Sequence, residues 1–515
     1  MNILGIGGVL GNAAAAVVSN GQIAAAIEEG KVDRRAQPGH LPNAAIEAGL
    51  KLAGLTPNQI DFVAVARPLP QGPGLPVALR AFPKARVILV DHHEAHAASA
   101  FFVSPFAEAA VVTLDRAGDL RCGSVWHGSG GKLALVEEIL YPDSIAELYG
   151  RVTELLGFRA RSDEHRVQWL APQGRPSYAD VFNRIVPDRR IDESYFNSGR
   201  QGHGGFGPKF FDATGLSISL PLTDEERADL AATMQGTLEA YVLRLAGDSK
   251  NICIAGGIGW NALLVDSLER AGRNVFAQPA SGNAGTALGA ALHVWNDMLG
   301  NAAHIDAGNY CLGPAFTPEE TKQVLENCKL RFHLLATQTG VIENTVKQLC
   351  QNHIVAWMQG RMEFGPRALG NRSILASPQD PYSTENLNAF IKHRESSRKF
   401  AASVPAELAS KYFDIGPNGR FLSTLGRVKP EYAEQFKAAV LARGIVRVHT
   451  VSREDNPLYW KLLHAFGEKT GLPVLYNTSF NLFGEPLVCT PRDAVRSFYS
   501  SGIDAMVVGN FLLEK

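Results

Sequence analysis

The segment GRMEFGPRALGNRSIL, from Gly360 to Leu375, is the stretch on which both the fold and the function of this chain turn. It follows the apolar run HIVAWM at 353–358, which has the composition of a buried strand. Glycine and proline fix its turns, while Arg361, Arg367 and Arg372 supply planar donors suited to phosphate or carboxylate oxygens. Solvated arginines on a surface loop are the alternative interpretation. So many arginines beside the end of a strand favour an anion-binding site.

The alternation of strands and helices around this segment predicts an α/β protein. Apolar runs at 2–7, 86–91, 109–115 and 251–255 are each followed by turn residues or by the start of a helical pattern. From Thr317 onward, two amphipathic segments precede the arginine-rich one. We therefore predict two domains, comprising residues 1–330 and 331–515.

The composition excludes several classes of protein. The 515 residues are 45% hydrophobic and 20% charged, which is ordinary for a globular protein large enough for two cores. A net charge of -1 gives no reason to expect nucleic acid or an anionic membrane as a partner. The N-terminus lacks the basic region of a signal peptide. The six cysteines form no CxxC pair, and Cys489 is interpreted as a core residue. These features predict a cytoplasmic protein.

Three glycine-rich turns in the first half are candidates for phosphate binding. They occupy residues 7–12, 255–261 and 281–289, each at a strand end or a helix start, where free backbone N–H groups can bind phosphate. Close packing explains any one of them equally well. Three in one domain favour a nucleotide cleft.

Two histidines four residues apart are candidates for metal binding. His92 and His96 follow the apolar run ARVILVD, and in a helix they would lie on one face at a spacing that suits one metal ion. A helix cap and a surface residue are the alternative, and spacing alone leaves both interpretations open.

Five motifs together resemble the NodU/CmcH-type O-carbamoyltransferase family. These motifs lie at residues 92–106, 165–174, 282–292, 360–375 and 477–491. The resemblance extends over nearly the whole chain. It implies a duplicated actin-like (ASKHA) domain, similar to the tRNA threonylcarbamoyltransferase, followed by a C-terminal α/β domain resembling YrdC, the threonylcarbamoyl-AMP synthase.

This resemblance implies ATP-dependent carbamoyl transfer. The C-terminal domain would form carbamoyl-AMP from carbamoyl phosphate and ATP with Mg²⁺, and the first domain would pass the carbamoyl group to a small-molecule acceptor. The expected catalytic residues are Arg361, Arg367, Lys392 and Arg394. The expected binding residues are Gly360, Glu363, Gly365, Arg372, Ser373, Arg398, Asn477, Thr478 and Ser479, with Gly256, Gly257, Asn261 and Gly285 in the first domain.

The resemblance also adds Asp115 to His92 and His96, which completes a ligand set for a divalent ion such as Fe²⁺. Relatives carry a further aspartate ligand where this chain has Asn283, whose oxygen is neutral.

Further departures surround the same expected pocket. A His-Asp pair is replaced by Gly11-Asn12, a glycine by Trp169, and Asp-Gly by Asp115-Arg116. These departures keep open a first domain that releases carbamoyl-AMP, carbamoylates an amine, or serves as a partner of another protein. The neutral charge argues against tRNA threonylcarbamoylation. The sequence names neither the acceptor nor the oligomeric state, so a homodimer stays open.

Overall fold

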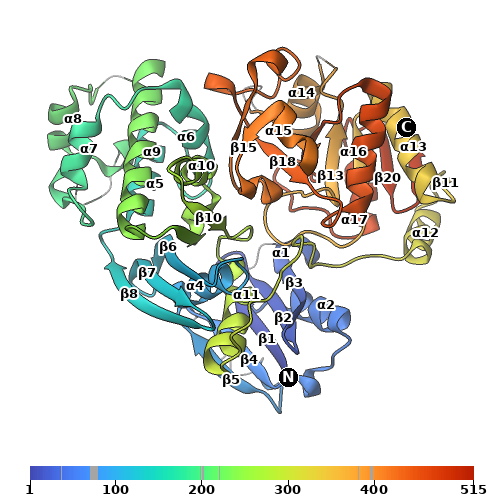
Figure 1. Cartoon of the computed structure of the whole chain (residues 1–515), viewed down its shortest axis with the longest axis horizontal. Coiled ribbons are helices and arrows are strands. Elements are labelled where there is room, and N and C mark those ends of the chain that lie inside the picture. Colours follow the sequence, from blue (N-terminus) through green and yellow to red (C-terminus); the bar gives the residue numbers. More distant parts are fainter. Residues whose placement is uncertain are drawn as a thin grey trace.

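Two five-stranded sheets with the same topology build the first half of the chain (Figure 1). The structure is a computed structural model that describes residues 1–35, 38–69, 79–197, 199, 202–219, 221–380, 382–394 and 398–515. The first sheet has the order β3-β2-β1-β4-β5 and the second the order β8-β7-β6-β9-β10. The ten strands are β1 (Asn2–Gly7), β2 (Ala14–Ser19), β3 (Gln22–Glu28), β4 (Phe62–Ala66), β5 (Arg86–Val90), β6 (Glu108–Gly118), β7 (Arg121–Ser129), β8 (Lys132–Leu140), β9 (Asn251–Ala255) and β10 (Asn274–Ala277).

The pairing directions repeat as well as the order. In each sheet the first three strands are antiparallel neighbours, and the last two run parallel to the central strand, β1 or β6. Short loops allow the hairpins, whereas the parallel pairs require crossovers. The duplicated actin-like architecture expected for this half is confirmed.

Two helices pack between the sheets and hold them together. They are α4 (His92–Phe101) and α11 (Gly285–Leu292), which contact each other and the central strands β6 and β1. A Cβ on Gly289 would lie 1.7 Å from the Ala95 carbonyl oxygen, so only glycine permits this approach. The small-residue motif at 282–292 is thus explained by packing.

A group of helices is inserted between strands of the second sheet, most of them between β8 and β9, and forms a hydrophobic core with that sheet (Figure 1). The helices of the first half are α1 (Glu29–Val32), α2 (Asn43–Ala53), α5 (Ile145–Leu155), α6 (Glu164–Leu170), α7 (Ala179–Ile185), α8 (Pro208–Thr214), α9 (Asp224–Ala246) and α10 (Ala262–Arg270), besides α4 and α11. No helix in the described part of the chain is both long and apolar enough to cross a membrane.

The C-terminal domain is built on a mixed sheet of eight strands in the order β11-β21-β20-β12-β13-β19-β14-β18, with a small sheet β15-β16-β17 beside it. Its strands are β11 (His333–Leu334), β12 (Val355–Met358), β13 (Arg372–Ala376), β14 (Ala401–Pro405), β15 (Phe413–Ile415), β16 (Gly426–Val428), β17 (Ile445–Val446), β18 (Val448–Val451), β19 (Leu475–Ser479), β20 (Ala505–Val508) and β21 (Phe511–Glu514). Its helices are α12 (Pro318–Asn327), α13 (Gln338–Cys350), α14 (Ser383–Asn386), α15 (Ala409–Tyr412), α16 (Pro457–Thr470) and α17 (Pro491–Tyr499).

Helix α12 belongs with this second domain. It packs against α17, and its buried Leu325 lies in the C-terminal core. We therefore draw the domain boundary before α12 rather than at residue 330.

Candidate functional site

A cavity of about 780 Å³ lies where the two domains meet. Loops of the first domain line most of it, and Pro366, Arg367, Arg398 and Arg447 line it from the C-terminal side. A second cavity of about 170 Å³, within the C-terminal domain, shares Trp169 and these four residues with the first. The two cavities therefore adjoin. We call them the transfer cavity and the arginine cavity.

The arginine cavity gathers Arg367, Arg394, Arg398 and Arg447. Burial, with the nearby charge of Arg398, lowers the pKa of Arg367 to about 10 and that of Arg394 to about 9. Burial and the other three arginines lower the pKa of Arg447 as well. The Arg447 Nε and Nη2 atoms are buried without a hydrogen-bond partner. Mutually repelling cations with unused donors are what an anion-binding site requires.

Polar groups of β19 complete the same cavity. Asn477, Thr478 and Ser479, which we predicted from the sequence as binding residues, line it. The Asn477 side-chain amide donates to the Ala368 carbonyl and to Ser403 Oγ, both at 3.2 Å, and its oxygen Oδ1 is buried without a partner. That oxygen can accept a hydrogen bond from a ligand N–H.

Three of the predicted basic residues lie outside both cavities, which corrects the expected anion site. Arg361 donates to the carbonyls of Ala24, Leu312 and Gly313. Arg372 is fully buried and donates to carbonyls that include those of Gln359, at 2.6 Å, and Pro314, at 3.1 Å. Lys392 Nζ donates to the Ser479 and Asn481 carbonyls at 2.6 and 2.9 Å. These cations satisfy buried carbonyls and so hold the loops in place.

Other predicted binding residues are also structural. The Glu363 carboxylate accepts from the backbone N–H groups of Leu369, Asn371 and Arg372. Gly360 and Gly365 have positive φ, and Ser373 is fully buried in β13. A Cβ on Gly256 or Gly285 would lie 2.2 or 2.1 Å from a carbonyl oxygen. Of the first-domain set, Gly257 and Asn261 line the transfer cavity.

The two histidines and the aspartate come together at the transfer cavity. Asp115 Oδ2 lies 3.3 Å from His92 Nε2 and 3.5 Å from His96 Nε2. Asp115 lines the cavity, while both histidines are buried behind it. Although burial alone would raise the pKa of Asp115, its contacts with the two histidines hold it well below its usual range. Burial lowers the pKa of His96.

These three residues fit a divalent metal ion. His96 is fully buried, yet neither of its ring nitrogens has a hydrogen-bond partner. Two imidazoles and a carboxylate are ligands that Zn²⁺, Fe²⁺ and similar ions prefer. His92 Nδ1 lies 3.2 Å from the Arg67 carbonyl oxygen, a contact that orients the ring. Asn283 lines the same cavity.

A second group, Glu94, His293 and Asp297, also has ligand atoms close together. Its members already have partners, because Lys132 Nζ lies 2.8 Å from Asp297 Oδ1 and His293 Nδ1 lies 3.6 Å from Glu94 Oε1. We interpret this group as an ion-pair cluster.

Two side chains at the junction of the cavities have roles that the motifs did not define. Trp169 lines both cavities, and the Arg447 guanidinium lies 5.2 Å from the centre of its ring. Sequence reasoning missed Arg447. Its one signal was a charged residue within the apolar run IVRVHTV, between β17 and β18.

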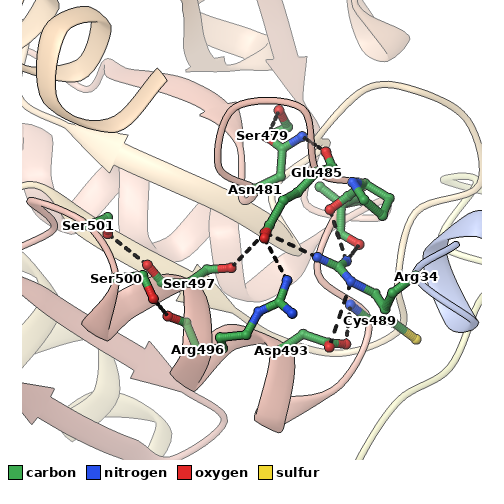
Figure 2. A network of polar contacts seen from close by, with 12 residues as sticks. Arg34, Ser479, Asn481, Glu485, Cys489, Asp493, Arg496, Ser497, Ser500 and Ser501 are labelled. Carbon is green, nitrogen blue, oxygen red and sulfur yellow. Dashed lines mark hydrogen bonds and ion pairs between the residues drawn. The ribbon is translucent and has the colours of Figure 1, made fainter. Parts of the chain in front are cut away.

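Arg34, just after α1, anchors the first domain to the C-terminal domain (Figure 2). It donates to the Pro486 and Leu487 carbonyls at 2.9 and 2.7 Å and lies 3.3 Å from the Glu485 carboxylate. Figure 2 shows Glu485 between Arg34 and Arg496. These contacts join the first domain to the C-terminal domain and so fix the relative position of the loops that line the cavities.

Comparison with known proteins identifies the family. Residues 77–292 match the profile of the carbamoyltransferase N-terminus, and residues 346–515 match that of the carbamoyltransferase C-terminus. Nodulation protein NolNO of Sinorhizobium fredii is 31% identical over 98% of this chain and 78% of its own length. The chain belongs to the carbamoyltransferase family. It is related to the NodU- and CmcH-type enzymes, as its motifs predicted.

Other relatives of this carbamoyltransferase differ in how much of it they share. An uncharacterized protein of Synechocystis is 34% identical over the full chain and 97% of its own length. The 3'-hydroxymethylcephem-O-carbamoyltransferase of Amycolatopsis lactamdurans is 33% identical over 50% of this chain and 47% of its own. Among solved structures, HypF of T. kodakarensis covers 59% of this chain and 48% of its own, at 15% identity and a TM-score of 0.36, a likeness too distant to inform on function.

Proposed function

We propose that this carbamoyltransferase forms carbamoyl-AMP in a YrdC-like C-terminal domain and transfers the carbamoyl group to a small-molecule acceptor in its ASKHA domain. One observation carries the proposal. The arginine cavity, in which Arg447 Nε and Nη2 are buried without a partner, adjoins a transfer cavity that has Asp115 in its wall.

The proposed first reaction has two steps. Water attacks the phosphorus of carbamoyl phosphate, the P–O bond to the carbamoyl group breaks, and carbamate leaves with the bonding electron pair while inorganic phosphate forms. A carbamate oxygen then attacks the α-phosphorus of ATP, which reaches the protein as its Mg²⁺ complex, and pyrophosphate leaves with its bonding electron pair. Arg367, Arg394, Arg398 and Arg447 would neutralise the charge that spreads over the phosphate oxygens. Asn477 Oδ1, buried without a partner, would accept from the carbamoyl N–H group.

The adjoining cavities support transfer without release. Carbamate and carbamoyl-AMP both react with water, so an enclosed route between two sites protects them. Trp169, Pro366, Arg367, Arg398 and Arg447 line both cavities and therefore flank that route.

In the first domain, His92, His96 and Asp115 would hold a divalent ion. A bound ion of this kind supplies a Lewis acid that polarises the carbonyl group. Gly11 and Asn12 line the cavity where relatives carry His-Asp, and neither can act as a general base. This favours an acceptor that is nucleophilic without prior deprotonation, such as an amine. Hydrolysis or release of carbamoyl-AMP is the second candidate, for the same reason.

The test is carbamoyl-phosphate-dependent exchange of radioactive pyrophosphate into ATP, followed by measurement of AMP with and without candidate acceptors. Exchange that requires carbamoyl phosphate supports adenylation in the C-terminal domain. Acceptor-stimulated AMP formation supports transfer, whereas AMP formation independent of any acceptor supports the second candidate. Absence of exchange contradicts the proposed first reaction.

A further inference from the structure

A third cavity, of about 570 Å³, has the Gly11-Asn12 turn in its wall. Its walls come from the β1–β2 turn and the segment around α1 in the first domain, and from residues 479–487 of the C-terminal domain. It shares Gly11, Asn12, Trp260 and Pro366 with the transfer cavity. The volume lies within the range of small-molecule pockets. We call it the accessory cavity.

Most charged side chains in its wall already have partners. Lys31 lies 2.8 Å from the Glu28 carboxylate and donates to the Glu363 carbonyl at 2.9 Å. Arg34 is held by the contacts shown in Figure 2, and Glu29 accepts from the backbone at the start of α2. Apolar side chains supply much of the remaining wall, among them Val9, Trp260, Pro366, Pro486 and Leu487. A wall of this composition favours an apolar ligand body.

Gly11 lines both the accessory and the transfer cavity. A Cβ built on Gly11 would meet no atom within 4 Å, and its φ is not in the left-handed region. Neither backbone conformation nor packing therefore requires glycine at this position. Any larger residue would extend into the open space beside Gly11.

We propose that the accessory cavity binds the apolar body of the acceptor, whose nucleophilic group passes Gly11 into the transfer cavity. The acceptor is then an elongated molecule with an apolar ring system and a nucleophile at one end. The role of this molecule as the acceptor rests on the proposed function. Binding of an apolar molecule in the cavity can be measured independently of that function.

The experiment uses 4-benzoylbenzylamine, an apolar diaryl ketone with an amine at one end, as a photoactivated probe of the full chain. We expect saturable labelling that mass spectrometry assigns to residues 479–487 or 9–13. Gly11→Phe, which extends into this open space, should weaken labelling at least tenfold. The matched control is Gly236→Phe, because Gly236 is exposed on α9 and a Cβ there also meets no atom within 4 Å.

Saturable labelling of these segments, weakened by Gly11→Phe and not by Gly236→Phe, supports the proposal. Labelling that does not saturate, that maps elsewhere, or that responds equally to both variants overturns it. Pyrophosphate exchange by the unmodified protein is measured in parallel. Its absence would refute the proposed adenylation while the labelling still decides the role of the cavity.

Discussion

Replacing Arg447 by methionine should change activity and stability in opposite directions. Arg447 faces three other arginines, and two of its nitrogens have no hydrogen-bond partner. Methionine keeps much of the aliphatic side chain that packs near Trp169 and removes the charge. Without ligand, the folded variant therefore lacks a repulsion between like charges. With ligand, the site lacks one cation that would bind the ligand's anionic group.

The two magnitudes can be worked separately. Loss of one charge-assisted phosphate contact costs about 2 to 4 kcal/mol, or roughly 30- to 1,000-fold in the rate of pyrophosphate exchange. Removal of an uncompensated, buried cation should raise the free energy of unfolding by about 1 kcal/mol. In a chain of this length that corresponds to an increase in melting temperature of roughly 1 to 3 °C.

The assays are pyrophosphate exchange and thermal melting, each with and without inorganic pyrophosphate. Pyrophosphate should raise the melting temperature of the unmodified protein, because it binds the folded state, and should do so less in Arg447→Met. Arg361→Met is the matched control. It removes the hydrogen bonds from the guanidinium to three carbonyl groups, so it should melt at a lower temperature and keep its response to pyrophosphate. An Arg447→Met protein that melts lower and exchanges normally would refute the assignment of this arginine to the anion site.

Three further outcomes are expected. Burial lowers the pKa of His449 to about 4 from 6.5, so its contribution to stability is present above pH 6.5 and lost as the pH falls toward 4. The melting temperature of His449→Gln should therefore vary less with pH across this interval. An unchanged pH dependence would contradict this role of His449. Asn283→Asp should bind divalent metal at least tenfold more tightly than the unmodified protein, and His96→Ala should no longer bind the metal. Equilibrium dialysis with elemental analysis measures both effects. Equal metal content in the unmodified protein and the two variants would exclude the proposed ligands. In a mass-spectrometric screen, amines should be carbamoylated faster than alcohols because position 11 supplies no base, and efficient carbamoylation of a simple alcohol would count against this reasoning.

Sequence patterns predicted the features that depend on residues close together in the chain. The spacing of His92 and His96 placed both on one face of α4, and the alternation of strands predicted the α/β fold. The arginine-rich segment shows the limit of such reasoning. Arg361 and Arg372 satisfy carbonyls of segments far away in the sequence, while Arg367 reaches the cavity, and no pattern within Gly360–Leu375 distinguishes them.

Contacts between residues far apart in the sequence explain the remaining differences between the predicted and the observed structure. Arg447, the single residue between β17 and β18, lines the same cavity as Pro366 and Arg367, which no motif records. The amphipathic pattern of α12 was predicted correctly, but the surface that covers it belongs to α17, near the other end of the domain. The position of the domain boundary therefore depends on packing contacts between distant segments, which sequence patterns do not predict.

The contacts of the first 35 residues with the C-terminal domain limit how this protein can be recombined. Lys31 and Arg34 donate to carbonyls of Glu363, Gly365, Pro486 and Leu487, so these loops are completed by the N-terminus. Expression of the C-terminal half alone would leave those carbonyls exposed. A chimera that exchanges this half between relatives must also exchange the α1 segment, and the modules of this enzyme are consequently discontinuous along the gene.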